Sequence, residues 1–277
     1  MNRLSHFTRE LIWFTTYPVL RQIRKLENLH SGQECYIFGD GQSVKKFELS
    51  AFANKIGIAV NAFPRHRDAW QLDLRYWLVA EPGFFLPPLV RLSGTYPRTY
   101  RNRLRLQSFY RRRPSDSSNL IQITSITNLP GLWTNQTYYF WDKLPRKDSD
   151  RDISTTKAMF AGSMYTALTI AQYLGFKKAF LIGFDYTHSP ATSNHWYENV
   201  SSILSPTELE GLQWDFFETM LKHIEIVTVT PTPQVTRLPS IDYKSLTGYD
   251  LGYRENSELL ALEDLEVLDL VSDYKIF

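Results

Sequence analysis

The chain has 277 residues, of which 43% are hydrophobic and 22% charged, and its formal net charge is +2. That length suits one large domain, and the composition excludes a disordered, a collagen-like or a disulfide-stapled protein. The charge balance excludes a surface built throughout for phosphate backbones, so we expect no nucleic-acid partner. The single cysteine, Cys35, permits no internal disulfide and no cysteine-based zinc site, which is typical of a reducing cytoplasm.

Residues 1–31 form a basic, aromatic and amphipathic segment. Apolar residues recur at nearly helical spacing between Leu4 and Leu29, and Pro18 is expected to break or kink the helix. Such a helix either packs on the domain or lies on an anionic membrane surface. The sequence has no apolar run long enough to cross a bilayer and no signal-peptide pattern. We therefore expect a soluble or peripheral protein in the cytoplasm, with a membrane contact at the inner face of the cytoplasmic membrane as a hypothesis.

Short apolar runs alternate with helical patterns over residues 32–250, which we interpret as the catalytic domain. One helix is predicted over Met159–Leu174, ended by Gly175, and another over Pro206–His223, with Ser205 as its N-cap. This alternation predicts an α/β, Rossmann-like fold, mostly a parallel sheet with helices on both faces and ligands beyond the carboxyl ends of its strands. The predicted strands are Cys35–Phe38, Gly57–Asn61, Tyr76–Ala80, Leu120–Thr124, Ala179–Ile182 and Ile224–Val229.

Two stretches carry opposite charge. Arg98–Arg113 holds seven arginines with aromatic residues between them, and Glu255–Asp273, within an acidic extension over residues 251–277, holds seven acids. The arginines suit either an anionic ligand or a solvated helix face that is partly paired with the acids, and both interpretations stay open.

The first group with possible chemistry is Gly39-Asp40-Gly41-Gln42-Ser43, directly after the first predicted strand. Glycines let the backbone approach a phosphate or nucleoside, and the amides that follow can point at an anion. The turn matches neither the dinucleotide fingerprint nor a Walker loop. Asn61 and Glu81 close the next two predicted strands, so both are expected beside this turn at the carboxyl edge of the sheet.

The second group is Gly183-Phe184-Asp185, which brings a carboxylate to the same edge, followed by His188 and His195. His195 is the better candidate for a general base, because its neighbours Trp196 and Tyr197 could exclude water and shift its pKa. A neutral imidazole is suited to taking a proton from a hydroxyl. A structural loop histidine is the competing interpretation. The pair Asp148 and Asp150 has the spacing of a metal-binding D-x-D motif, but the run around it reads as a solvated loop, so no metal is expected.

Taken in order, these residues resemble the bacterial sialyltransferases of glycosyltransferase family 42 and related surface-polysaccharide biosynthesis proteins. The resemblance rests on Gly39-Asp40-Gly41-Gln42-Ser43-Val44, Asn61, Tyr173-Leu174-Gly175-Phe176-Lys177-Lys178, Gly183-Phe184-Asp185 and His195, and it spans residues 33–231.

The resemblance implies a fold of the A-type glycosyltransferase variety and an inverting, metal-independent transferase. Such an enzyme moves a sugar from a CMP-sugar donor to a glycan acceptor on the bacterial surface, with no cofactor. His195 would be the base, with His188 as the alternative. Tyr186 and Tyr197 would hold the departing phosphate. The donor nucleotide would lie against Gly39, Asp40, Gly41, Ser43, Asn61, Glu81, Ser163 and Asp185, with Ser154-Thr155-Thr156 as the alternative to Ser163.

The sequence departs from the family at Asp40, where relatives carry asparagine, and a carboxylate cannot donate a hydrogen bond to a phosphate. Two other functions therefore stay open. In a magnesium-dependent enzyme like the hydroxymethylpterin pyrophosphokinases, Asp40 and Asp185 would bind the ion. In a non-catalytic polysaccharide-assembly protein, the fold would remain while the site has decayed.

Overall fold

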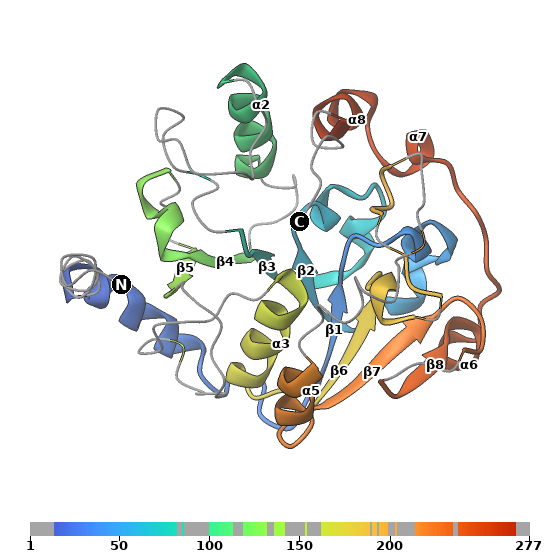
Figure 1. Ribbon diagram of the computed structural model, residues 1–277, viewed down its shortest axis with the longest axis horizontal. Helices are drawn as coiled ribbons and strands as arrows, with labels where there is room; N and C mark the ends of the chain where they lie inside the picture. Colours follow the sequence, from blue (N-terminus) through green and yellow to red (C-terminus); the bar gives the residue numbers. More distant parts are fainter. Residues whose placement is uncertain are drawn as a thin grey trace.

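The computed structural model describes residues 14–81, 85, 100–112, 119–131, 136–141, 153, 162–188, 190–192, 194–198, 203, 214–234 and 238–269. Within these residues, eight strands form one sheet in the order β5-β4-β3-β2-β1-β6-β7-β8 (Figure 1), and all neighbouring strands are parallel. The predicted α/β fold with a parallel sheet is confirmed. The strands are β1 Glu34–Phe38, β2 Ile56–Val60, β3 Asp73–Val79, β4 Ile121–Ser125, β5 Thr137–Phe140, β6 Lys178–Ile182, β7 Glu225–Thr230 and β8 Ser240–Asp242.

All six predicted strands are present, with ends that differ by at most three residues from the predicted ones. The sequence analysis missed β5 and β8. Both are short edge strands, and β8 has only intermediate or exposed residues. β8 therefore lacks the continuous apolar run by which the inner strands were found. β5 is mostly buried, so this reason does not apply to it.

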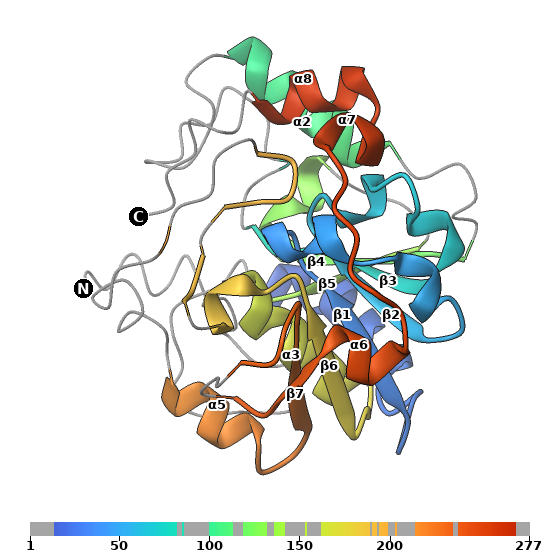
Figure 2. The ribbon, with the colours of Figure 1, turned by 90° about the vertical axis from the view of Figure 1, so that its right-hand side faces the viewer.

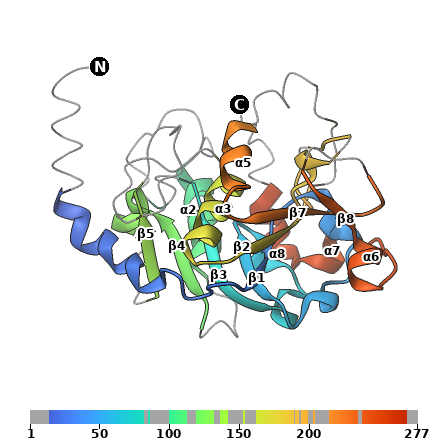
Figure 3. The same ribbon diagram turned by 90° about the horizontal axis from the view of Figure 1, so that it is seen from below.

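Alternate strand residues point to two hydrophobic cores, one on each face of the sheet. Cys35 and Ile37 of β1 point toward α3 (Ser163–Tyr173) and α5 (Trp214–Met220), which lie next to each other in Figure 3. Tyr36 and Phe38 point to the opposite face. Helices thus cover both faces, as predicted. The opposite face holds α2 (Tyr100–Arg111), α6 (Tyr243–Thr247), α7 (Asn256–Leu259), α8 (Leu262–Asp269) and the 3₁₀ turns η2 (Gln42–Lys46), η3 (Leu49–Phe52), η4 (Phe63–Arg65) and η5 (Ala69–Gln71).

The helix before β6 ends where the sequence predicts. Gly175 has a φ of +88°, and its amide donates to the Gln172 carbonyl, so a glycine stops α3 in the left-handed conformation. The first residues predicted for this helix, and the Ser205–Pro206 start of the next one, lie outside the described residues.

Pro18 does not end the N-terminal helix. Residues 14–20 are α-helical through Pro18, and the chain continues as the 3₁₀ helix η1 (Arg21–Leu26). Leu20 packs with Tyr139 and Trp141 near β5, and Ile23 and Leu26 enter the core of the α3 face. This part of the segment therefore packs on the domain. No helix among the described residues has the length and apolarity that a bilayer crossing requires.

The arginine stretch and the acidic extension meet in space. Figure 2 shows α2, α7 and α8 side by side at one end of the molecule. Arg112 of the α2 end contacts Asp264 and lies 3.6 Å from Glu263, and Arg105 lies 3.9 Å from Glu266. These contacts favour the paired helix face over an anion-binding stretch.

Candidate functional site

The candidate site lies beyond the carboxyl ends of β1 and β6. The chain leaves β1 toward β2 and, after β5, returns to β6 on the other side of β1. Ligands of open α/β sheets bind at such a reversal of strand order. The turn Gly39–Gly41 follows β1 and the turn Gly183–Asp185 follows β6, so the two motifs found in the sequence are neighbours in the fold.

The glycines of these turns are explained by the contact between the turns themselves. A Cβ on Gly41 would lie 2.7 Å from Asp185 Cγ, and one on Gly39 would lie 2.7 Å from the Gly183 carbonyl oxygen. The Gly41 amide donates to that same carbonyl at 2.7 Å. Close packing of two backbones, rather than the approach of a phosphate, is thus sufficient to require glycine here.

The turn amides were expected to face a bound anion. Instead, the Ser43 amide faces the side-chain carboxylate of Asp185. Asp185 accepts a hydrogen bond from the Ser43 amide at 2.6 Å and another from the Ser43 hydroxyl. Both residues are buried. A nucleotide phosphate would find these two donors occupied.

Asp40 is buried between the turn after β2 and the loop that carries His195. Its carboxylate accepts from the Ala62 amide at 3.2 Å and from Trp196 Nε1 at 3.3 Å. Burial raises the pKa of Asp40 to about 6, against the opposing effects of the His195 charge and both hydrogen bonds. The side chain contacts protein on both oxygens, which distinguishes it from a group that faces an open nucleotide pocket.

Asn61 and Ser163 meet across the edge of the sheet. Asn61 follows β2, has a φ of +49°, and donates from Nδ2 to Ser163 Oγ at 3.2 Å. Ser163 is the first residue of α3, which begins after Gly162 at a φ of +119°. Glu81 is farther away than predicted, because it follows β3 and β2 lies between β3 and β1.

His195 is held beside the glycine turn by its backbone and by an acidic partner. Its backbone forms an antiparallel bridge with Gly41, and its Nδ1 lies 3.2 Å from Glu198 Oε1. The carboxylate accepts, so Nδ1 carries the hydrogen and Nε2 is the lone-pair nitrogen of the neutral ring. Among the described residues, none donates to Nε2.

The electrostatics make this imidazole a stronger base. Burial lowers the pKa of His195, but the hydrogen bond to Glu198 and the charges of Asp40 and Glu198 outweigh it, so the pKa lies above its ordinary value. The same pairing holds the pKa of Glu198 below its ordinary value despite burial. Sequence reasoning missed Glu198; an acid three residues after a loop histidine belongs to no periodic pattern.

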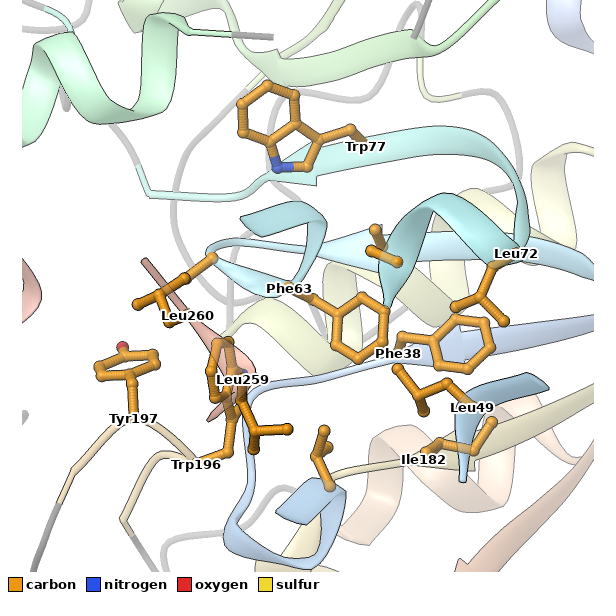
Figure 4. Packing of buried hydrophobic residues seen from close by; sticks show 14 of the residues in the cluster. Phe38, Leu49, Phe63, Leu72, Trp77, Ile182, Trp196, Tyr197, Leu259 and Leu260 are labelled. Carbon is orange, nitrogen blue, oxygen red and sulfur yellow. The ribbon is translucent and has the colours of Figure 1, made fainter. Parts of the chain in front are cut away.

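The loop of His195 is anchored in the core. Figure 4 shows Trp196 and Tyr197 packed beside Leu259 and Leu260 of the C-terminal segment. The Tyr197 ring stacks on the His195 ring at a centroid distance of 5.0 Å and an interplanar angle of 2°. Gln42, a second residue without a predicted role, donates from Nε2 to the His195 carbonyl at 2.5 Å.

The other candidate side chains lie after β6. Burial raises the pKa of Tyr186 well above its ordinary value, so its hydroxyl keeps its proton. His188 is buried, its Nδ1 lies 3.9 Å from Asp185 Oδ1, and burial lowers its pKa. Asp148, Asp150 and Ser154-Thr155-Thr156 lie outside the described residues, and the described part of the chain holds no cluster of three metal-ligating groups.

A cavity of about 380 Å³ lies next to the Ser43 and Asp185 contact. Of the predicted site residues, these two and His188 line it, whereas Asp40, Asn61 and His195 do not. The predicted residues therefore gather at one edge of the sheet without surrounding this single cavity.

Comparison with known proteins gives two distant structural likenesses. No protein family and no curated protein matches the sequence. The sialyltransferase CstII from Campylobacter jejuni, solved with the substrate analogue cytidine-5'-monophosphate, is 13% identical, with a TM-score of 0.44 over 88% of this chain and 99% of that chain. The Maf glycosyltransferase from Magnetospirillum magneticum AMB-1 is 11% identical, with a TM-score of 0.46 over 93% of this chain and 42% of that one. Similarities this low do not assign an activity.

Proposed function

We propose that the chain is a metal-independent, inverting glycosyltransferase that moves a sialic-acid-like sugar from a CMP donor to a bacterial surface glycan. The observation that carries the proposal is the paired histidine at the strand-order reversal: His195, oriented by Glu198, lies beside the glycine turn. The donor class comes from the sequence resemblance. Four of its five segments lie at this edge of the sheet, whereas residues 173–178 lead into β6 and lie at the opposite edge.

The reaction follows from the state of the imidazole. Nε2 of His195 takes the proton of the acceptor hydroxyl as its oxygen attacks the anomeric carbon from the face opposite the leaving group. The bond from that carbon to the phosphate oxygen breaks, and CMP leaves with the electron pair. Phenolic hydroxyls of Tyr186 and Tyr197 are the proposed donors to the departing phosphate.

The magnesium-dependent alternative would use Asp40 and Asp185 as ion ligands. Asp40 already accepts from Ala62 and Trp196, and both oxygens of Asp185 accept from Ser43. These hydrogen bonds favour structural roles for the two carboxylates.

Thermal-shift measurements with nucleotides test the donor class, since a ligand that binds only the folded state raises the melting temperature. We expect CMP to raise it equally with and without a chelator. A shift that needs ATP and magnesium together would replace the proposal with the pyrophosphokinase alternative.

Substitution tests the base. His195→Ala is expected to keep the circular-dichroism spectrum and to lower turnover of the CMP-sugar about a hundredfold. Loss of activity in a His188 variant alone would move the base to that residue. Full cellular function without the His195 imidazole would favour the assembly protein.

A further inference from the structure

The cavity beside Asp185 is separate from the imidazole of His195 and has its own chemistry. It lies between the start of η2, the turn after β6 and the segment after β7, and its volume is about 380 Å³. That volume is near the lower end of the range for small-molecule sites. It suits one sugar residue better than a whole nucleotide sugar.

The lining carries an excess of positive charge. Lys45 and Lys46 line the cavity together with Asp185, the one carboxylate among the described lining residues, and both oxygens of Asp185 are already bonded to Ser43. Lys45 is buried, and its ammonium donates to the Glu198 carbonyl at 3.1 Å, which fixes the charge in place. Acids outside the lining, Glu198 and Glu255, act on Lys45 as well. An anionic group of a ligand is the complement to this lining.

The same cavity has hydrogen-bond acceptors without donors. His188 is 8% exposed, lines the cavity, and has no hydrogen-bond partner on Nε2. The Val229 backbone and the Asp185 carboxylate both favour a proton on this ring, and because Nε2 has no partner, we assign that proton to Nδ1, which lies 3.9 Å from Asp185 Oδ1. Nε2 of the neutral ring is therefore a buried acceptor. Gln234 Oε1 is a second unpartnered acceptor in this lining.

We propose that this cavity binds an acidic sugar residue, with Lys45 and Lys46 facing its carboxylate or phosphate and His188 and Gln234 accepting from its hydroxyls. A ligand that offers both an anion and neighbouring hydroxyl donors satisfies the lysines and the orphan acceptors together. The role of this sugar as the acceptor residue rests on the transferase function proposed above.

Calorimetric titration of the full chain with three probes tests the inference: glucuronate, glucose 6-phosphate and glucose. We expect one of the two anionic probes to bind at least tenfold more tightly than glucose, and the stronger one distinguishes a carboxylate from a phosphate. Equal affinity for all three would overturn the inference.

Variants locate the site. Lys46→Ala is expected to weaken binding of the anionic probe about tenfold. Lys222 is an exposed lysine before β7 at the opposite edge of the sheet, and Lys222→Ala is expected to leave this binding unchanged. His188→Asn keeps a donor near the position of Nδ1 for Val229 but removes the Nε2 acceptor, and weakens binding about fivefold. Equal effects of the two lysine variants, or no effect of His188→Asn, would place the ligand elsewhere.

CMP separates this inference from the transferase function. Binding of glucuronate or glucose 6-phosphate that CMP does not displace supports an acceptor site. Displacement of the anionic probe by CMP overturns that role, since the cavity would then be the donor's phosphate site. If CMP binds and no acidic sugar does, the cavity inference is wrong and the proposed transferase function is unaffected. If an acidic sugar binds and CMP does not, the transferase function is wrong and the cavity inference is unaffected.

Discussion

Replacing Asp40 with asparagine tests whether burial, rather than ligand binding, determines the state of this carboxyl group. Asp40 is 8% exposed and accepts hydrogen bonds from the Ala62 amide and from Trp196. Burial raises its pKa from an ordinary 3.8 to about 6, although the charge of His195 and both hydrogen bonds act in the opposite direction. The folded protein therefore keeps this proton over a pH range in which the unfolded chain releases it.

The magnitude follows from linkage. Between pH 3.8 and about 6 the folded state binds more protons than the unfolded state, so the free energy of unfolding falls as the pH rises. A difference of about two pKa units corresponds to about 3 kcal/mol. This contribution is fully present below pH 3.8 and is lost by the time the pH has passed 6. Asparagine has no such proton, so the variant lacks this slope.

Urea unfolding of both chains from about pH 4 to about pH 7.5 measures the effect. As the pH rises across that range, the free energy of unfolding of the variant should increase by about 3 kcal/mol relative to that of the native chain. Weaker hydrogen bonds of the asparagine side chain lower the variant's free energy of unfolding by the same amount at every pH. The pH dependence of the difference between the two chains therefore still reports the titration of Asp40. Parallel curves would show that the Asp40 carboxyl titrates alike in the folded and unfolded chains, and the burial argument would be wrong.

Three further substitutions test separate contacts. Glu198→Gln removes the charge that raises the pKa of His195, so turnover of CMP-sialic acid falls about tenfold or more and the acid limb of its pH profile moves to lower pH; an unmoved limb contradicts the pairing. Gly41→Ala places a Cβ 2.7 Å from a carboxyl carbon and costs about 1–3 kcal/mol in urea titration. Gly252→Ala, which meets open space, serves as its control, and similar losses would refute the packing account. Arg112→Ala removes contacts with two acids of α8 and is expected to lower the free energy of unfolding by about 1 kcal/mol, and by less in high salt. A loss that does not depend on salt would indicate that Arg112 contributes by packing instead.

The inner strands were predictable because each is buried on both faces. Ile37 and Phe38 point to opposite cores, so the run around them is apolar without interruption. The edge strand β8, whose residues are intermediate or exposed, lacks that signal. Pro18 lies inside the described helical residues 14–20, which continue as η1, so the expected break at this proline is wrong.

The sequence predicted that the candidate residues lie together at one edge of the sheet, but it did not predict their contacts. Strand ends located the glycine turn, Asn61 and Asp185, because parallel strands deliver their carboxyl ends to one edge, and the loop after β6 brings His195 to the same edge. Partner choice depends on loop geometry that no periodicity encodes. The sequence thus predicted that Ser43 binds a ligand, whereas in the structure its amide and hydroxyl both donate to Asp185.

The hydrogen bonds from Ser43 to Asp185 lead to a prediction about the turn. Asp185 occupies the position that an anion would take on the Ser43 amide and hydroxyl, so Asp185→Ala leaves two buried donors without an acceptor. We expect a loss of about 3 kcal/mol in the free energy of unfolding. Inorganic phosphate should restore part of it, because the vacated space and the free donors form an anion site. Phosphate at ten times its dissociation constant would add about 1.4 kcal/mol.

The control is Asp264→Ala, which removes another buried carboxylate, paired with Arg112 at the far helix. Phosphate also stabilises folded proteins by exclusion from their surface, and this general effect is shared by both variants. The excess stabilisation of Asp185→Ala over Asp264→Ala therefore measures binding at the turn. If phosphate stabilises the two equally, the turn is shaped by Asp185 alone and has no capacity for an external anion. The phosphate of the proposed donor would then have to bind on the side of Asn61 and Ser163, which are joined by a hydrogen bond at the edge of β2.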